Sequence, residues 1–167
     1  PEQTPLLTAD QIAPIPNSWW FHRISDESRA TLTGEQVRAL DVAAVGISGL
    51  TDEQIAELSD EQIRQLGYRD FERLSPTQIP VLTPDQVATI PNEWYFRRIP
   101  EASRAALTGE QVRALNVAEL GIGELTAAQV GELSTAQIQS LSWHEIRHLL
   151  PAQAPLLSAD QVGSINN

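Results

Sequence analysis

The sequence predicts an all-α protein, a solenoid or superhelix of very short capped helices with about eight residues per unit. Three observations predict this fold. An octad, L-[ST]-x-x-Q-[IV]-x-x, recurs along the chain; nine such units form a longer repeat; and the apolar spacing fits neither one long helix nor a strand. The units of the first copy begin at Leu7, Ile15, Ile24, Leu32, Leu40, Leu50, Leu58, Leu66 and Leu74.

The longer repeat is visible in three similar phrases. "PLLTADQIAPIPNSWWFHRI" begins at Pro5, "PVLTPDQVATIPNEWYFRRI" at Pro80 and "PLLSADQVGSINN" at Pro155. We expect the end of a preceding repeat at 1–4, repeat 1 at 5–79, repeat 2 at 80–154 and the start of a third at 155–167, all in one continuous solenoid. The chain begins at Pro1 within this pattern, which predicts a segment of a longer protein.

Each octad has the features of a helix start. Ser or Thr followed three residues later by Gln is a capping box, as in Thr51 with Gln54 and Thr126 with Gln129. The leucine before the cap and the Ile or Val after the Gln form a hydrophobic staple. Pro76 and Pro84 fit the first helical position, and first-turn acids are favoured by the helix dipole; these acids are Asp52, Glu53 and Asp85.

The octads cannot join into one long helix. Eight residues at about 100° each turn the apolar stripe by roughly 80° per unit, so a straight helix cannot bury it on one side. Apolar spacings of five and three also alternate between the faces of a strand. We therefore expect helices of roughly five to seven residues that are stable only when stacked. Unit starts at 7, 32, 58 and 82 group the nine units into three near-equal layers.

The second unit of each copy concentrates the aromatic residues. It reads "IPNSWWFH" from Ile15 and "IPNEWYFR" from Ile90, and Asn17 and Asn92 are expected to cap its helix. We predict that Trp19 and Trp94 fill the core and that Trp20 and Tyr95 are partly exposed. Large rings can also serve as binding hot spots or sugar-stacking platforms, so a binding role for Trp20 and Tyr95 stays open.

The third unit of each copy places an arginine where the apolar staple residue should be. These residues are Arg29 and Arg104, and with Arg23 and Arg98 they form a recurring basic cluster. One interpretation is an ion pair within the chain, with Glu27, Glu35 or their neighbours. The other is a docking point for a partner that bears carboxylates, present once in each copy of the longer repeat.

The eighth unit of the second copy contains an H-E-x-x-H motif at His144, Glu145 and His148. On a helix this motif can hold zinc with two histidines, and its glutamate can polarise the bound water. Here Glu145 falls where other units carry the capping Gln, so we predict that it caps the helix of Ser142. No third ligand follows in the expected pattern, so His144 and His148 are weak metal candidates and we expect no cofactor.

Composition narrows the partners. Against 22 acidic residues the chain has 11 basic ones, all arginine, and the net charge is −11. This charge repels phosphate backbones and anionic membranes, so we expect no nucleic-acid partner. No apolar run reaches the roughly 20 residues that span a bilayer, so we expect no membrane insertion. The fragment is expected to be monomeric.

Two resemblances follow from these residues. "LTPDQVATI", from Leu82 to Ile90, is similar to the opening of the repeat in TAL effectors, but "PNEWYFRR" follows it in place of a base-reading pair. Over nearly the whole chain, the L-[ST]-x-x-Q-[IV] units resemble repeats of very large secreted or surface-exposed bacterial proteins such as adhesins and toxins. That resemblance implies a secreted or cell-surface location and a modular role without catalysis.

The leading hypothesis is a nonenzymatic structural and protein-interaction module. Its partners would be other proteins or neighbouring repeats of the same chain. The alternative is a glycan- or peptide-binding module that uses the aromatic and arginine units, and a zinc hydrolase built on the H-E-x-x-H motif ranks third.

Overall fold

The computed structural model describes residues 7–147, 149 and 151–165. Within these residues the secondary structure is helical throughout. The α-helices are α1 (Ala9–Ile12), α2 (Ser18–Phe21), α3 (Asp26–Arg29), α4 (Gly34–Ala39), α5 (Val42–Val45), α6 (Asp52–Ala56), α7 (Asp60–Gln65), α8 (Tyr68–Phe71), α9 (Pro84–Ala88), α10 (Glu93–Phe96), α11 (Glu101–Ala105), α12 (Gly109–Ala114), α13 (Val117–Leu120), α14 (Ala127–Gly131), α15 (Thr135–Ser140), α16 (Trp143–Ile146) and α17 (Ala159–Gly163); a 3-10 turn, η2, spans Ala154–Leu156.

The helices begin where the octads predict. Thr51 and Gln54 exchange both bonds of a capping box, as do Thr126 and Gln129. Pro84 begins α9, and the Asn17 side chain caps α2. The α-helices contain four to six residues, slightly fewer than the expected five to seven. Each helix ends early because the chain must turn before it reaches the staple residue of the next unit.

The ninth unit of each copy departs from the expected pattern, because neither forms an α-helix among its described residues; in the second copy a turn at 151–153 leads into η2. Ser75 and Gln78 make the two capping-box bonds, but the segment that follows Pro76 is a turn and not an α-helix. Pro80 explains the difference. It lacks an amide hydrogen, and its ring disfavours helical geometry at the preceding residue, so the helix stops after one turn.

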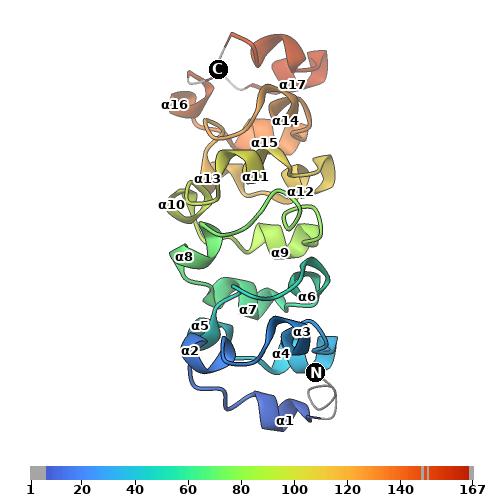
Figure 1. Cartoon of the computed structure of the whole chain (residues 1–167). Helices are drawn as coiled ribbons and strands as arrows, with labels where there is room; N and C mark the ends of the chain where they lie inside the picture. Colours follow the sequence, from blue (N-terminus) through green and yellow to red (C-terminus); the bar gives the residue numbers. More distant parts are fainter. Residues whose placement is uncertain (1–6, 148, 150, 166–167) are drawn as a thin grey trace.

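The chain forms an elongated stack, with α1 at one end and α17 at the other (Figure 1). Helices three units apart in sequence contact each other, including α1 with α4, α9 with α12 and α10 with α13. Six short helices, α2, α5, α8, α10, α13 and α16, follow one side of the stack, the left side of Figure 1. These contacts agree with layers of three units.

The capping glutamines also join one layer to the layer before it. Their Oε1 atoms accept the amides of their own caps, and their Nε2 atoms donate to backbone carbonyls of the preceding layer. Gln111, which is 1% exposed, donates to Ile79 O and Leu82 O, both at 2.7 Å. Gln36, Gln54, Gln62, Gln86, Gln129, Gln137, Gln153 and Gln161 donate in the same way. A single glutamine side chain thus provides hydrogen-bond partners both for an amide at its own helix start and for backbone carbonyls of a neighbouring chain turn.

The core is a continuous column of Leu, Ile and Val with a phenylalanine in each aromatic unit. The prediction that Trp19 and Trp94 fill this core is wrong, because they are 57% and 49% exposed. Phe21 and Phe96 are fully buried in their place. After an Asn cap the phenylalanine stands at the fourth helical position, which is the staple position and points inward in the octads.

Candidate functional site

Exposed aromatic rings gather on the side of the stack formed by α2, α8, α10 and α16. The exposed rings are Trp19, Trp20, Tyr68, Trp94 and Trp143. Trp20 is 53% exposed and Tyr95 is half-buried, so the partial exposure predicted for both is confirmed. Exposed apolar side chains that gather on one side often mark an interaction site, which makes this side the leading candidate for an interaction surface.

The rings pack edge to face both within a helix and between layers. Trp19 meets Trp20 with centroids 4.8 Å apart, and Trp94 meets Tyr95 at 4.9 Å. Tyr68 of α8 lies 5.6 Å from Trp94 of α10, so the two helices form one aromatic ridge. Such pairs contribute about 0.5–1.5 kcal/mol beyond the area they bury.

Arginines cover the faces of two of these rings. The guanidinium carbon of Arg23 lies 4.6 Å from the centroid of Trp19, and that of Arg98 lies 4.8 Å from the centroid of Trp94. Arg98 also donates to Glu72 at 3.0 Å. The attraction between a guanidinium and the face of an indole favours these positions.

Arg29 and Arg104 differ from Arg23 and Arg98 because they point inward. Arg29 is 5% exposed, donates to the carbonyls of Ile24 and Phe21, and pairs with Asp26. Arg104 donates to Ile99 O at 2.6 Å and to Glu124 at 2.7 Å. Their partners are thus Asp26 and Glu124, while Glu27 and Glu35 make no ion pair within the described residues. Both arginines support the fold, and we leave them out of the candidate surface.

The surface arginines of this side are less often neutralised than arginines elsewhere. Together with the exposed rings they form what we call the aromatic–arginine strip; its arginines are Arg23, Arg69, Arg73, Arg97, Arg98 and Arg147. Four of the six, Arg23, Arg69, Arg73 and Arg147, form no ion pair with a described carboxylate. The remaining arginines of the chain all pair with one; these are Arg29, Arg38, Arg64, Arg104 and Arg113.

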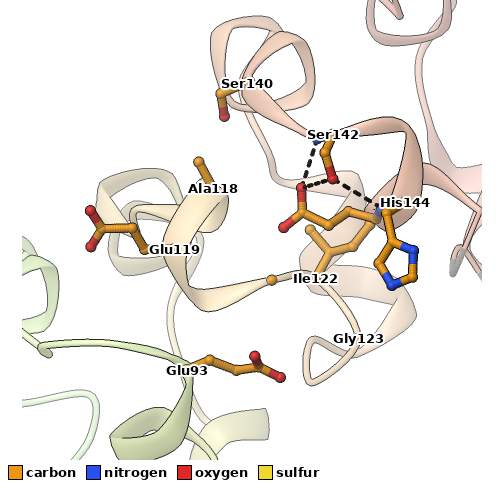
Figure 2. A pocket seen from close by; sticks show the side chains of 10 residues that line it. Glu93, Ala118, Glu119, Ile122, Gly123, Ser140, Ser142 and His144 are labelled. Atoms are coloured by element: carbon orange, nitrogen blue, oxygen red, sulfur yellow. Dashed lines mark hydrogen bonds between the residues drawn. The ribbon is translucent and has the colours of Figure 1, made fainter.

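A hollow of about 540 Å³ lies beside α13, between α10 and α16. Glu93, Glu119 and His144 stand around it, and the backbone of Ile122 and Gly123 forms its wall (Figure 2). The equivalent place in repeat 1 is narrowed by Asp70, whose carboxylate accepts the Ile47 amide at 3.1 Å.

The H-E-x-x-H segment has the capping geometry predicted for it. The Glu145 carboxylate accepts the Ser142 amide at 2.7 Å and the Ser142 hydroxyl at 2.9 Å (Figure 2). His144 is exposed on α16, and His148 lies outside the described residues. No group of three metal-binding side chains is found among the described His, Asp and Glu residues. Glu145 is thus occupied as a cap, as the octad pattern indicates.

Tyr68, Arg69, Arg73 and Trp143 belong to the strip but were not singled out from the sequence. A signal for Tyr68 was present. Grouping the units into layers places the unit from Leu66 directly before the unit from Ile90 on the same side of the stack. That grouping brings Tyr68 to Trp94.

No protein-family model, no curated protein and no solved structure matches the chain. Among the helices that the structure describes, none has the length and apolar character needed to cross a membrane.

Proposed function

We propose that the chain is part of an all-α solenoid with a structural and protein-interaction role and no catalytic role of its own. Its long repeats would extend a larger protein and present the same surfaces at regular intervals. From the resemblance of its octads, that protein would be a secreted or surface-exposed bacterial protein. Proteins and neighbouring repeats of the same chain are the expected partners.

The glutamine bonds between layers are the observation that supports this role. Gln111 ties its layer to Ile79 and Leu82, and Gln36, one repeat earlier, donates to Leu7 O. The backbone carbonyls of one layer thus accept hydrogen bonds from the glutamines of the next layer, and its own glutamines donate to carbonyls of the layer before it. An architecture of this kind can be lengthened without redesign of its core, which suits a spacer that carries repeated surfaces.

Lengthening the chain tests the proposal directly. Chains with one and with two further copies of residues 80–154 should show maximum dimensions in small-angle X-ray scattering that rise by an equal step for each copy. A globular protein grows only as roughly the 0.38 power of its length. A maximum dimension that follows that weaker dependence would contradict the solenoid.

A ligand-binding module is the second candidate, favoured by the exposed rings of the strip. It would hold a glycan or peptide near Trp20 and Tyr95, beside Arg23 and Arg98. Tryptophan fluorescence titrated against neutral glycans and against acidic peptides distinguishes it from the spacer role. A saturable shift with a glycan that Trp20→Ala abolishes would favour this candidate.

The zinc-hydrolase alternative has its own test. With Glu145 bound to its helix cap, we expect no peptidase activity and no change in melting temperature after chelation by EDTA. A peptidase activity that the His144→Ala variant loses would overturn the nonenzymatic proposal. The Arg69 and Arg73 positions of repeat 1 provide the matched control, because the His144→Arg variant restores the repeat-1 residue there.

A further inference from the structure

The aromatic–arginine strip holds six of the eleven arginines of a protein whose net charge is −11. Its arginines recur with the layers of the stack. Arg23, Arg73 and Arg98 each follow the C-terminal residue of a four-residue helix by two positions, with two layers between the first pair and one between the second. Arg23 and Arg73 are exposed and form no ion pair with a described carboxylate.

A second surface carries the opposite charge with the same spacing. We call it the acidic row; its members are Asp10, Glu35, Asp60, Asp85, Glu110 and Asp160. The first five recur once in every layer, and the sixth comes two layers later. All six are exposed and none takes part in an ion pair within the described residues. They belong to α1, α4, α7, α9, α12 and α17, away from the helices of the strip (Figure 1).

We propose that the aromatic–arginine strip of one copy of this chain docks side by side on the acidic row of a second copy. Because both surfaces advance in step with the layers, one arginine–carboxylate contact that is in register places the others in register too. The inference rests on the proposed interaction role and names its partner. It replaces the sequence-based expectation of a monomer.

The chemistry of the strip favours carboxylates over sugar rings. Arg23 and Arg98 cover the faces of Trp19 and Trp94, so the surface offered there is a guanidinium plane backed by an indole. A planar guanidinium held in place binds a carboxylate through two parallel hydrogen bonds. Among the described residues, the acidic row is the set of exposed carboxylates without an arginine partner that recurs with the spacing of the layers.

The contact is heterologous, because different surfaces of the two copies meet. Each copy in a pair keeps one free strip and one free row, so association continues beyond the dimer unless the geometry closes a ring. The acids of the row also have a local role near the starts of their helices, where the dipole favours negative charge. That role alone would leave the protein monomeric, which makes the two explanations separable.

Sedimentation velocity over a range of protein concentrations tests the proposal. At about 0.01 M salt, where charges are felt over about 30 Å, the weight-average mass should rise with concentration above that of one chain. At about 1 M salt, where the range falls to about 3 Å, the protein should sediment as a monomer. A monomer at every concentration and both salt levels would overturn the proposal.

Two charge-reversal variants identify the surfaces. Arg23→Glu with Arg73→Glu reverses the strip, and Asp60→Arg with Glu110→Arg reverses the row with the same two-layer separation. Each variant alone should lose self-association, and an equal mixture of the two should recover it, because the altered strip of one meets the altered row of the other. Failure of the mixture to associate would overturn the assignment of these surfaces.

A third variant and a spectroscopic control complete the experiment. Ala102→Glu with Ala128→Glu adds acidic charge away from both surfaces, at positions where repeat 1 carries Glu27 and Glu53, and should keep the association of the parent chain. Circular dichroism of every variant reports whether the stack is intact. A parent chain that lacks helicity would count against the proposed solenoid, whereas a helical parent chain that stays monomeric counts against the docking alone. Binding of a polyuronate by a chain that stays monomeric would also overturn the second-copy partner.

Discussion

The two copies predicted at 5–79 and 80–154 hold the same buried arginine with different acids. In the first, Arg29 pairs with Asp26, which lies one helical turn earlier and is almost fully exposed. In the second, Arg104 pairs with Glu124, which lies in a later unit, is 26% exposed and also contacts Arg97 at 3.2 Å. Gly49 stands where Glu124 does, and its carbonyl accepts from Arg29 Nε.

The bonds that the two arginines share are those to the backbone. Each guanidinium donates to the carbonyl at the start of its own unit, Ile24 or Ile99, and lies over the buried ring of Phe21 or Phe96. The hydrogen bonds to backbone carbonyls are therefore common to both copies, while the acid that pairs with the arginine differs.

A second difference separates Asp70 from Glu145. Asp70 is buried and accepts two amides, that of Gly67 at its own helix start and that of Ile47 across the junction, whereas Glu145, among the described residues, accepts only from Ser142 of its own unit. The Ile122 amide, equivalent to that of Ile47, has no such partner among the described residues. The acid of the first copy thus joins two units, while that of the second stays within its own unit.

The largest expected effect concerns what the two copies have in common. Phe21→Ala and Phe96→Ala should each lower the free energy of unfolding by about 3–5 kcal/mol, because both rings are fully buried. Trp19→Ala and Trp94→Ala should lower it by about 0.5–1.5 kcal/mol, the worth of an aromatic pair. Urea denaturation measures both series. A tryptophan variant as damaging as its phenylalanine counterpart would restore the original core prediction.

The acids of the two buried arginines should differ in importance. Glu124→Gln removes a carboxylate that bridges Arg97 and Arg104, and we expect a loss of about 1–2 kcal/mol for this partly buried pair. Asp26→Asn removes an exposed carboxylate and should cost less than about 1 kcal/mol. Melting temperatures of the two single variants and of the double variant give the comparison. Equal losses would mean that solvent screens both pairs alike.

Shortening Glu145 should convert the second copy to the first. In the Glu145→Asp variant we expect the carboxylate to accept the Ile122 amide, as Asp70 accepts Ile47, and to raise the stability by about 0.5–1.5 kcal/mol. Hydrogen exchange at the Ile122 amide should slow in the same variant. The Asp70→Glu change is the matched reverse and should be destabilising; a gain from both would contradict the assignment.

The smallest effect depends on pH. A hydrogen bond from its own backbone amide, and then one from the Thr51 hydroxyl, lower the pKa of Glu53 below 4.5. Because the folded pKa is depressed, the stabilisation is present above the unfolded pKa and is lost as the pH falls through the lower folded value. The melting temperature between about pH 5 and 3 should therefore fall less steeply in Glu53→Gln. Ala128→Glu should introduce the same dependence of melting temperature on pH into the second copy. If neither variant changes the dependence of melting temperature on pH, Glu53 does not contribute to stability in this way.

Much of the local structure could be predicted from single units. The caps at Thr51 and Asn17 follow from short-range chemistry, and Glu145 fits the same scheme. The same scheme would also have identified Phe21, since it stands at the staple position, but its neighbours Trp19 and Trp20 offered larger apolar side chains. The bonds from Gln111 to Ile79 and Leu82 could not be predicted, because they depend on how far one layer rises above another. The pairing of Arg104 with Glu124 has the same origin.

The glutamine bonds between layers also determine how the molecule responds to force. They run along the stack, so a pull on its two ends loads them in series, one layer after another. We expect the layers to yield singly at low force, each releasing about 25 residues, or roughly 85 Å of extended chain. A relaxed layer meets intact carbonyls on the layer before it and can close again. We therefore expect the stack to lengthen in steps under tension and to shorten again when the tension is released.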